Sequence, residues 1–194
     1  MNLLVIGGSR FVGPLLIENL IGRKHRVTVF NRGFISQEYP EEVRFIKGDR
    51  TQKFGLKEKF DAIIDMCAYK GADTVRALSE LNFDFFVHMS STAVYEKTGD
   101  FPLTEESPLG DWPLWGEYNQ GKIECETVLE KSGVNFALLR PVYILGPKNS
   151  ADRERFIYSK IKAGDKIIIP GNGEAIVQFV WANDVAEAIM LLTE

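Results

Sequence analysis

Residues 1–13 read MNLLVIGGSRFVG, and this stretch decides the fold. Residues 3–6 form an apolar run with the length of a buried strand, and apolar residues at helical spacing follow over 11–21. The glycines of GGSRFVG permit a tight turn and let a phosphate approach the backbone closely. The stretch therefore predicts a strand, a glycine-rich turn and a helix whose first amides point toward an anion.

One position of this turn departs from the usual glycine pattern. Gly7, Gly8 and Gly13 meet the requirements of the turn, but Arg10 stands where a phosphate-binding loop normally has another glycine. An arginine with ordinary dihedrals still offers its backbone N–H, and its guanidinium adds a bidentate phosphate donor. A tight structural turn without a ligand is the alternative, and the strand before it and the helix after it favour phosphate binding.

Further short apolar runs recur along the chain, and most are continuous rather than alternating. The expected strands cover residues 27–30, 43–46, 62–64, 85–89 and 136–139, and the expected helices cover residues 74–81 and 117–130. Continuous apolar strands are covered on both faces, and alternation of strands with helices is typical of parallel sheets. We therefore expect an α/β fold, a doubly wound parallel sheet of the Rossmann type with ligands at the carboxyl ends of its strands.

The composition is that of an ordinary globular chain. Of 194 residues 45% are hydrophobic, and 23 basic against 27 acidic residues give a net charge of −4. Because neither sign forms long runs, nucleic acid and anionic membranes are not favoured partners. No apolar run approaches the roughly 20 residues of a bilayer span, so we expect a cytoplasmic protein. Cys67 and Cys125 lie far apart and predict neither a disulfide framework nor a metal site.

The end of the second expected strand bears on the cofactor. Dinucleotide-binding folds of this kind usually have an acidic residue there, which holds the ribose 2′-hydroxyl. Here the uncharged Asn31 and the cationic Arg32 take its place, which together with Arg10 favours NADP over NAD. The alternative is that Arg32 is a solvated loop residue. Asp49, followed by Arg50, can accept a hydrogen bond from the adenine amino group or form an Asx turn.

A tyrosine and a lysine are the strongest candidates for chemistry. The segment WGEYNQGKIECE places Tyr118 and Lys122 four residues apart, on one face of a helix. An ammonium near a phenol stabilises the phenolate, which makes the phenol usable as a general acid or base. A surface pair on an amphipathic helix is the alternative. In HMSSTAVY, the hydroxyls of Ser90, Ser91 and Thr92 end the fifth strand, where they can orient a substrate or form a turn.

Five segments, GGSRFVG, SSTAVY, YNQGK, LLRPVYILGP and PGNGEAIVQFVWANDVA, occur in this order over essentially the whole chain. Together they resemble the extended short-chain dehydrogenase/reductase family, specifically its NAD-dependent epimerase/dehydratase group. The resemblance implies that Tyr118 is the catalytic acid/base, that Lys122 supports it and binds the nicotinamide ribose, and that Ser91 is the catalytic hydroxyl. It also implies a homodimer formed through the tyrosine-bearing helix and the helix before it.

The same resemblance implies that Cys67 and Ala68, after the fourth strand, lie alongside the cofactor, and that Pro141 and Val142 contact its nicotinamide side. The residues expected to bind the cofactor are Gly7, Gly8, Arg10, Phe11, Val12, Gly13, Asn31, Arg32, Asp49, Arg50, Cys67, Ala68, Ser90, Tyr118, Lys122, Pro141 and Val142. Arg10 in place of the middle glycine is similar to a subgroup with GGTRF-type loops, which includes chloroplast stem-loop RNA-binding proteins.

We expect residues 1–194 to form a single NAD(P)-binding Rossmann domain. Residues 98–113 contain three prolines and predict a long loop before the tyrosine helix. Residues 146–180 would contribute to a small, partial substrate lobe. Its expected elements are a helix over 153–163 and strands over 166–169 and 175–180. The apolar face of a final helix over 183–193 needs a partner, and we expect a chain that is truncated at its C-terminus or naturally short.

Three functions remain open from the sequence. The first is hydride transfer between NAD(P) and a carbinol carbon of a small substrate such as a nucleotide sugar, giving epimerisation, dehydration or reduction. The second is an RNA-binding protein on the same fold, which the net charge of −4 disfavours. The third is a noncatalytic NADP sensor, which retention of Ser91, Tyr118 and Lys122 disfavours.

Overall fold

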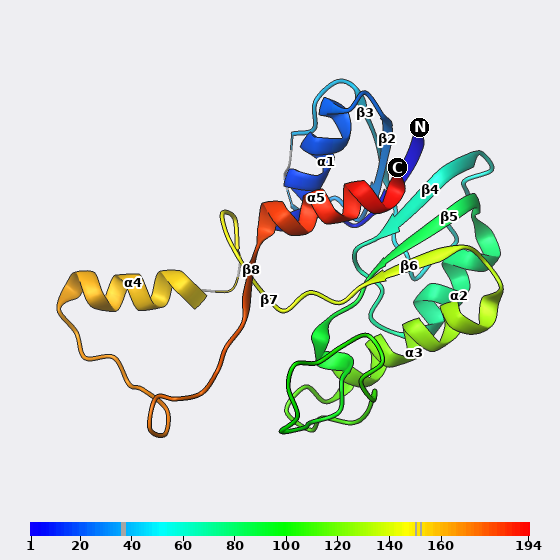
Figure 1. Cartoon of the computed structure of the whole chain (residues 1–194). Coiled ribbons are helices and arrows are strands. Elements are labelled where there is room, and N and C mark those ends of the chain that lie inside the picture. Colours follow the sequence, from blue (N-terminus) through cyan, green and yellow to red (C-terminus); the bar gives the residue numbers. More distant parts are fainter. Residues whose placement is uncertain (36–37, 150, 152) are drawn as a thin grey trace.

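The apolar segments predicted as strands form one parallel sheet (Figure 1). This computed structural model describes residues 1–35, 38–149, 151 and 153–194. Over these residues the sheet has six strands. They are β1 (Asn2–Ile6), β2 (Arg26–Asn31), β3 (Val43–Lys47), β4 (Lys59–Asp65), β5 (Asn82–Met89) and β6 (Phe136–Leu139). The α/β prediction is therefore confirmed, and β4 and β5 are longer than the apolar runs that revealed them.

The strand order β3-β2-β1-β4-β5-β6 places the first strand in the middle of the sheet. In the register, Val5 of β1 pairs with Val29 on one side and with Ile64 on the other. The chain winds outward in both directions from this centre, so the order reverses between β1 and β4. In open sheets of this kind ligands bind at that reversal, outside the carboxyl ends of the strands.

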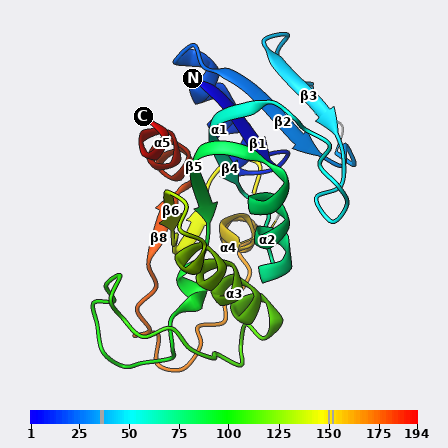
Figure 2. The same ribbon diagram turned by 90° about the vertical axis from the view of Figure 1, so that its right-hand side faces the viewer.

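Helices cover both faces of the sheet (Figures 1 and 2). On one face lie α1 (Val12–Gly22) and α5 (Ala182–Thr193), which share one apolar core with β1, β2 and β4. On the other lie α2 (Gly71–Glu80) and α3 (Glu117–Ser132), whose residues Ala77 and Leu129 pack in a second core. Apolar side chains from successive strand positions feed the two cores alternately, which explains the continuous apolar runs.

The apolar face of the last helix packs in the core that it shares with α1. The predicted helix is confirmed as α5, and its Val185 and Ile189 are buried in the core that α1 shares. Leu192, in contrast, remains 38% exposed. The carboxylate of Glu194 lies 3.1 Å from Arg23, so an ion pair links the ends of the two helices.

The segment after the sheet differs from the prediction. The expected helix is present as α4 (Arg153–Ala163), but residues 166–169 form no strand, and of residues 175–180 only the last two belong to one. That strand, β8 (Phe179–Trp181), pairs with an unpredicted β7 (Tyr143–Leu145). Ile168 is 90% exposed. Isoleucine-rich composition raises β propensity, but a strand needs a neighbouring edge to pair with, which residues 166–169 lack among the described residues.

Residues 98–113 contain no helix or strand, as predicted. The loop is nevertheless anchored, because Tyr95 and Leu109 form an isolated antiparallel bridge. The Asn119 amide at the start of α3 donates to the carbonyls of Ala93 and Gly110, 2.6 and 3.0 Å away. In the described part of the chain, no helix combines the length and apolar character that a membrane span requires.

Candidate functional site

The glycine turn has the geometry that a close approach requires. Gly7 and Gly8 have φ values of +96° and +72°, which L side chains rarely adopt. A Cβ on Gly13 would lie 2.3 Å from the Gly8 carbonyl oxygen, so only glycine allows α1 to start this close to the end of β1. The turn therefore brings the first amides of α1 to the point where the strand order reverses.

Arg10 keeps ordinary backbone geometry, and the unusual conformation falls on the next residue. Among the described non-glycine residues only Phe11, Lys24 and Lys148 have positive φ, and Phe11 has a φ of 52°. The Arg10 side chain is exposed, and its carbonyl accepts from the Gly13 amide at 2.9 Å. The first turn of α1 contains no acidic residue, and no side-chain hydrogen bond caps it. These features fit a pyrophosphate.

Asn31 supports the turn rather than facing away from it. Its amide nitrogen donates to the Gly7 carbonyl at 3.1 Å and to the Tyr39 hydroxyl at 3.0 Å, while its oxygen accepts from the Gly33 amide. The neighbouring Arg32 is exposed, and its guanidinium carbon lies 4.8 Å from the centre of the Phe34 ring. Arg32 therefore presents its charge at the surface next to the turn.

Asp49 and Arg50 have contacts within the protein. Asp49 accepts from the Thr51 amide and hydroxyl at 2.9 and 2.8 Å, and these bonds lower the pKa of its carboxyl group. This is the Asx turn that we considered as the alternative. The largely buried Arg50 guanidinium lies 2.5 Å from an Asp65 oxygen and donates to the Asp73 carbonyl at 2.9 Å. Arg50 thus joins the loop after β3 to β4 and α2.

The Cys67 side chain packs against the glycine turn at Gly7. A Cβ on Gly7 would lie 3.0 Å from its sulfur, and its amide donates to Asp65 at 3.1 Å. Burial, followed by the charge of Asp65, raises the pKa of the Cys67 thiol to about 11. The thiol is therefore protonated near neutral pH and acts as a small apolar surface. Ala68, the next residue, is fully buried.

Lys122 is buried at the carboxyl end of β5. Its ammonium donates to the Met89 carbonyl at 2.6 Å, and the residue is only 2% exposed. The same nitrogen lies 6.0 Å from the ring centre of Tyr118, which is 38% exposed. Burial lowers the pKa of Lys122, and the Asp65 carboxylate opposes that change. The predicted pair thus links a buried ammonium to a phenol at the surface.

The three hydroxyls after β5 have different surroundings. Ser90 is 3% exposed, and its hydroxyl donates to the buried Glu126 carboxylate. The half-buried Ser91 begins the short 3₁₀ helix η1 (Thr92–Val94), where its oxygen accepts from the Ala93 amide at 3.1 Å. Thr92 donates through its amide and its hydroxyl to the Pro141 carbonyl. Ser90 therefore supports the core, while Ser91 lies at the rim.

Beneath this rim lies a buried ion pair that no sequence motif predicted. Glu126 is fully buried, and Arg140 donates to both its oxygens at 3.1 and 2.7 Å. Arg140 also reaches the Tyr95 hydroxyl and the Glu105 carbonyl, at 3.1 and 3.2 Å. The hydrogen bonds to Glu126 raise the pKa of Arg140. Two features of the sequence could have indicated this pair: Glu126 lies four residues after Lys122, and Arg140 lies inside the apolar segment LLRPV.

The fold and the site together define a class. A parallel doubly wound sheet, a glycine turn at its reversal and a tyrosine–lysine helix against β5 are the features of a dinucleotide-binding protein of the short-chain dehydrogenase/reductase type. A profile of the NAD dependent epimerase/dehydratase family matches residues 3–77 and 71–194. The chain belongs to this family.

Comparison with individual proteins gives the same picture. A chloroplast stem-loop binding protein of 41 kDa from Arabidopsis thaliana is 31% identical over 97% of this chain and 54% of its own length. The 2′-dehydrokanamycin reductase of Streptomyces kanamyceticus is 28% identical over 97% of this chain and 57% of its length. The chain thus spans about half the length of these curated relatives.

A solved structure shares the fold. The UDP-glucuronic acid 4-epimerase from Bacillus cereus, in complex with UDP-glucuronic acid and NAD, superposes with a TM-score of 0.80. The match covers 100% of this chain and 73% of that chain, at 17% sequence identity. At this identity the likeness concerns the architecture alone.

The buried ion pair leads to a stability prediction. Arg140→Ala should lower the free energy of unfolding by about 3 kcal/mol, because the Glu126 carboxylate stays buried without its partner. Arg44→Ala is the control, since the Arg44–Glu58 pair has side-chain exposures of 55% and 35%. Its loss should stay below about 1 kcal/mol. Urea unfolding followed by circular dichroism measures both, and equal losses would contradict a buried network.

Proposed function

We propose that this protein transfers a hydride between NAD(P) and a carbinol carbon of a small substrate, as an epimerase/dehydratase or a reductase. The observation that carries the proposal is the Lys122 ammonium, which is buried on the Met89 carbonyl and lies 6.0 Å from the half-exposed Tyr118 ring. When bound, the nicotinamide cofactor would supply the hydride acceptor and donor. Family membership supports the assignment.

Each candidate residue has a role that its environment supports. Tyr118 would exchange the proton of the substrate hydroxyl, because it lies at the surface with the Lys122 ammonium 6.0 Å from its ring centre. Lys122 would supply that positive charge and bind the nicotinamide ribose. Ser91, at the rim after β5, would orient the substrate hydroxyl. The buried Ser90, which the sequence analysis placed among the cofactor ligands, would instead hold this rim in position through Glu126.

The glycine turn and two arginines support binding of NADP in preference to NAD. The backbone of residues 7–13 and the positive end of α1 would hold the pyrophosphate. The exposed Arg10 and Arg32 flank this turn, and no acidic side chain replaces them there to repel a 2′-phosphate. Because the Arg50 guanidinium is occupied by Asp65 and the Asp73 carbonyl, Arg32 is the better candidate for the phosphate.

A nucleotide sugar is the proposed substrate class. The Bacillus cereus structure with the same architecture holds UDP-glucuronic acid. In this chain, residues 146–180 would contribute only part of a substrate lobe, because α4 has no buried residue among those described. We propose that further polypeptide completes this lobe in a longer form of the protein, as the lengths of the relatives support.

A titration with both reduced dinucleotides tests the cofactor proposal. We expect NADPH to bind more tightly than NADH, and Arg32→Ala to weaken NADPH by about tenfold with little effect on NADH. A hydrogen bond to a charged group typically contributes about 1.5–3 kcal/mol, which sets this scale. Fluorescence of the reduced nicotinamide reports binding.

Arg26→Ala is the matched control for this titration, because Arg26 is an exposed residue at the opposite end of β2. It should leave both affinities unchanged. Binding of neither dinucleotide would contradict the cofactor proposal as a whole. Equal effects of Arg32→Ala on NADH and NADPH would contradict only the proposed role in selecting the 2′-phosphate.

Replacement of the phenol tests the catalytic proposal. Tyr118→Phe should reduce turnover of a nucleotide-sugar substrate by about a hundredfold or more, the usual scale of general acid/base catalysis. Its affinity for the dinucleotide should stay within about twofold of the parent. The measurement is chromatography of the products across a panel of UDP- and dTDP-sugars, combined with the absorbance of the reduced nicotinamide, because epimerisation and dehydration cause no net change in the cofactor. Arg44→Ala, which removes an exposed ion pair with Glu58, is the control, and undiminished turnover in Tyr118→Phe would refute the assignment.

A second function has one specific observation in its favour. The Arabidopsis thaliana relative at 31% identity is a chloroplast stem-loop binding protein. The net charge of −4 opposes polyanion binding by this chain. Retention of a stem-loop RNA that falls steeply with salt would favour this function over a purely enzymatic one.

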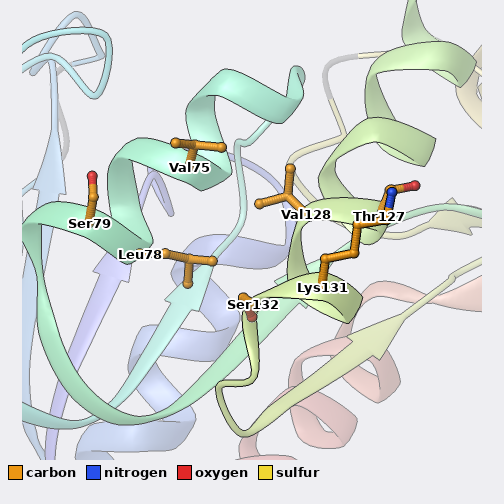
Figure 3. A pocket seen from close by; sticks show the side chains of 7 residues that line it. All are labelled: Val75, Leu78, Ser79, Thr127, Val128, Lys131 and Ser132. Carbon is orange, nitrogen blue, oxygen red and sulfur yellow. The ribbon is translucent and has the colours of Figure 1, made fainter.

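We also propose a homodimer through the outer faces of α2 and α3. These faces enclose a shallow hollow of about 490 Å³, in which Val75 and Leu78 of α2 face Val128 of α3 (Figure 3). Val75 is 52% exposed although it is a large apolar residue. Two copies of such a face would bury each other's apolar side chains, as isologous interfaces do.

Sedimentation analysis checks the dimer. The parent protein should sediment as a dimer, and Val75→Asp should shift it toward the monomer, because the new charge would be desolvated in the interface. Val177→Asp is the control, since Val177 is 51% exposed and lies outside α2 and α3. A monomeric parent, or a Val75→Asp dimer as stable as the parent, would rule out this interface.

A further inference from the structure

Tyr69 is an aromatic residue next to Lys122 that none of the functional assignments uses. It lies in the loop between β4 and α2, two residues after Cys67. The Lys122 nitrogen lies 5.0 Å from the Tyr69 ring centre, closer than its 6.0 Å distance from the Tyr118 ring centre. The two rings are 6.2 Å apart and inclined by 46°. The ammonium is thus within cation–π distance of both.

The backbone holds Tyr69 in this place. Its amide donates to Asp73 at 2.9 Å, which fixes the loop to the first turn of α2. The loop also touches α3, because a Cβ on Gly121 would lie only 1.9 Å from the Tyr69 carbonyl oxygen. The Gly71 amide donates to Glu124 at 3.0 Å. Glycine at position 121 therefore brings Tyr69 against the helix one residue before Lys122.

The other groups near Lys122 have partners or carry no charge, so the two aromatic rings are considered as contacts of its ammonium. An ammonium has three N–H donors, and the Met89 carbonyl accepts one of them. The buried Asp65 carboxylate also acts on Lys122, but it is already 2.5 Å from Arg50. Cys67, Cys125 and His88 also lie within electrostatic reach, and burial lowers the pKa of His88 to about 4, so its imidazole is neutral at pH 7. Besides the Met89 carbonyl, the direct contacts of the ammonium among the described residues are the faces of these two rings.

We propose that Tyr69 is a positioning residue of the candidate site, which with Tyr118 forms an aromatic cage that holds the Lys122 ammonium on the Met89 carbonyl and shields it from water. The 52% exposure of Tyr69 means that its ring reaches from the buried ammonium to the surface. The catalytic meaning of the cage rests on the proposed function, since it matters for turnover only if Lys122 supports Tyr118. The cage itself does not depend on a bound cofactor.

Acylation of lysines tests the cage on the cofactor-free protein. Dilute acetic anhydride at one alkaline pH, with peptide mass spectrometry, gives the labelling rate of each lysine. Tyr69→Ala should raise the rate at Lys122 by about three- to tenfold, the scale expected when one cation–π contact is lost. Tyr69→Phe should restore the parent rate because it keeps the ring. Lys53, an exposed lysine outside α2 and α3, serves as the internal reference.

Matched variants separate the cage from general loosening. Tyr158→Ala removes a 70% exposed tyrosine from α4 and should leave the Lys122 rate unchanged. If Tyr69→Ala lowers the melting temperature enough to expose the helix, Tyr69→Leu replaces it, since leucine keeps apolar bulk without an aromatic face. The cage predicts faster labelling in Tyr69→Leu as well.

Two results would overturn the inference. One is a Lys122 labelling rate that is the same in the parent, Tyr69→Ala and Tyr69→Leu. The other is a Tyr69→Phe rate as high as that of Tyr69→Ala, which would assign the effect to the hydroxyl group. Neither result depends on dinucleotide binding or turnover, so failure of the cage and failure of the proposed enzymatic function can be told apart.

Discussion

The contact between the backbone at Gly8 and the first turn of α1 is the constraint on which the site depends. A side chain at Gly13 would overlap the Gly8 carbonyl, so the strand and helix meet only through glycine. That contact places the helix amides at the reversal of strand order, where β1 and β4 separate. A second contact of the same kind, between Gly121 and Tyr69, brings α3 against the loop after β4. Backbone contacts therefore set the separation of the glycine turn from the helix that carries Tyr118 and Lys122.

Two buried ion pairs hold the loops that connect these elements. Arg50 joins the loop after β3 to Asp65 at the end of β4, and Arg140 joins the end of β6 to Glu126 of α3. Buried pairs of this kind contribute little net stability, because desolvation offsets their attraction. Their geometry is specific, however, since either charge left alone in the core would be costly. They therefore define one arrangement of the strand ends beneath Tyr118, Lys122 and Ser91.

Local patterns predicted the sheet, the glycine turn and the spacing of Tyr118 and Lys122, because each depends on residues close in sequence. The absent strand at 166–169 shows the limit, since β propensity does not indicate whether an edge is available to pair with. Arg50 and Ser90 show another limit. Their motifs suggested ligand contacts, but their partners, Asp65 and Glu126, are 15 and 36 residues away in sequence, and only the fold brings them together.

The backbone conformation explains why the glycine turn tolerates an arginine at position 10. The conformation that would exclude an L side chain does not fall at Arg10, which keeps ordinary φ, but at Phe11, whose φ is 52°. With a φ of 52° and a ψ of −103°, Phe11 has a sparsely populated backbone conformation that costs an L residue roughly 1–3 kcal/mol, and Phe11 packs against the α1 core, whose burial offsets that cost. The turn can therefore carry a cation at its tip without losing its shape. Because Arg10 is exposed and no acidic residue lies in the first turn of α1, its charge adds to the positive end of the helix. An arginine in place of the usual glycine thus increases the positive potential at the amino end of α1 while the close approach of the backbone is retained.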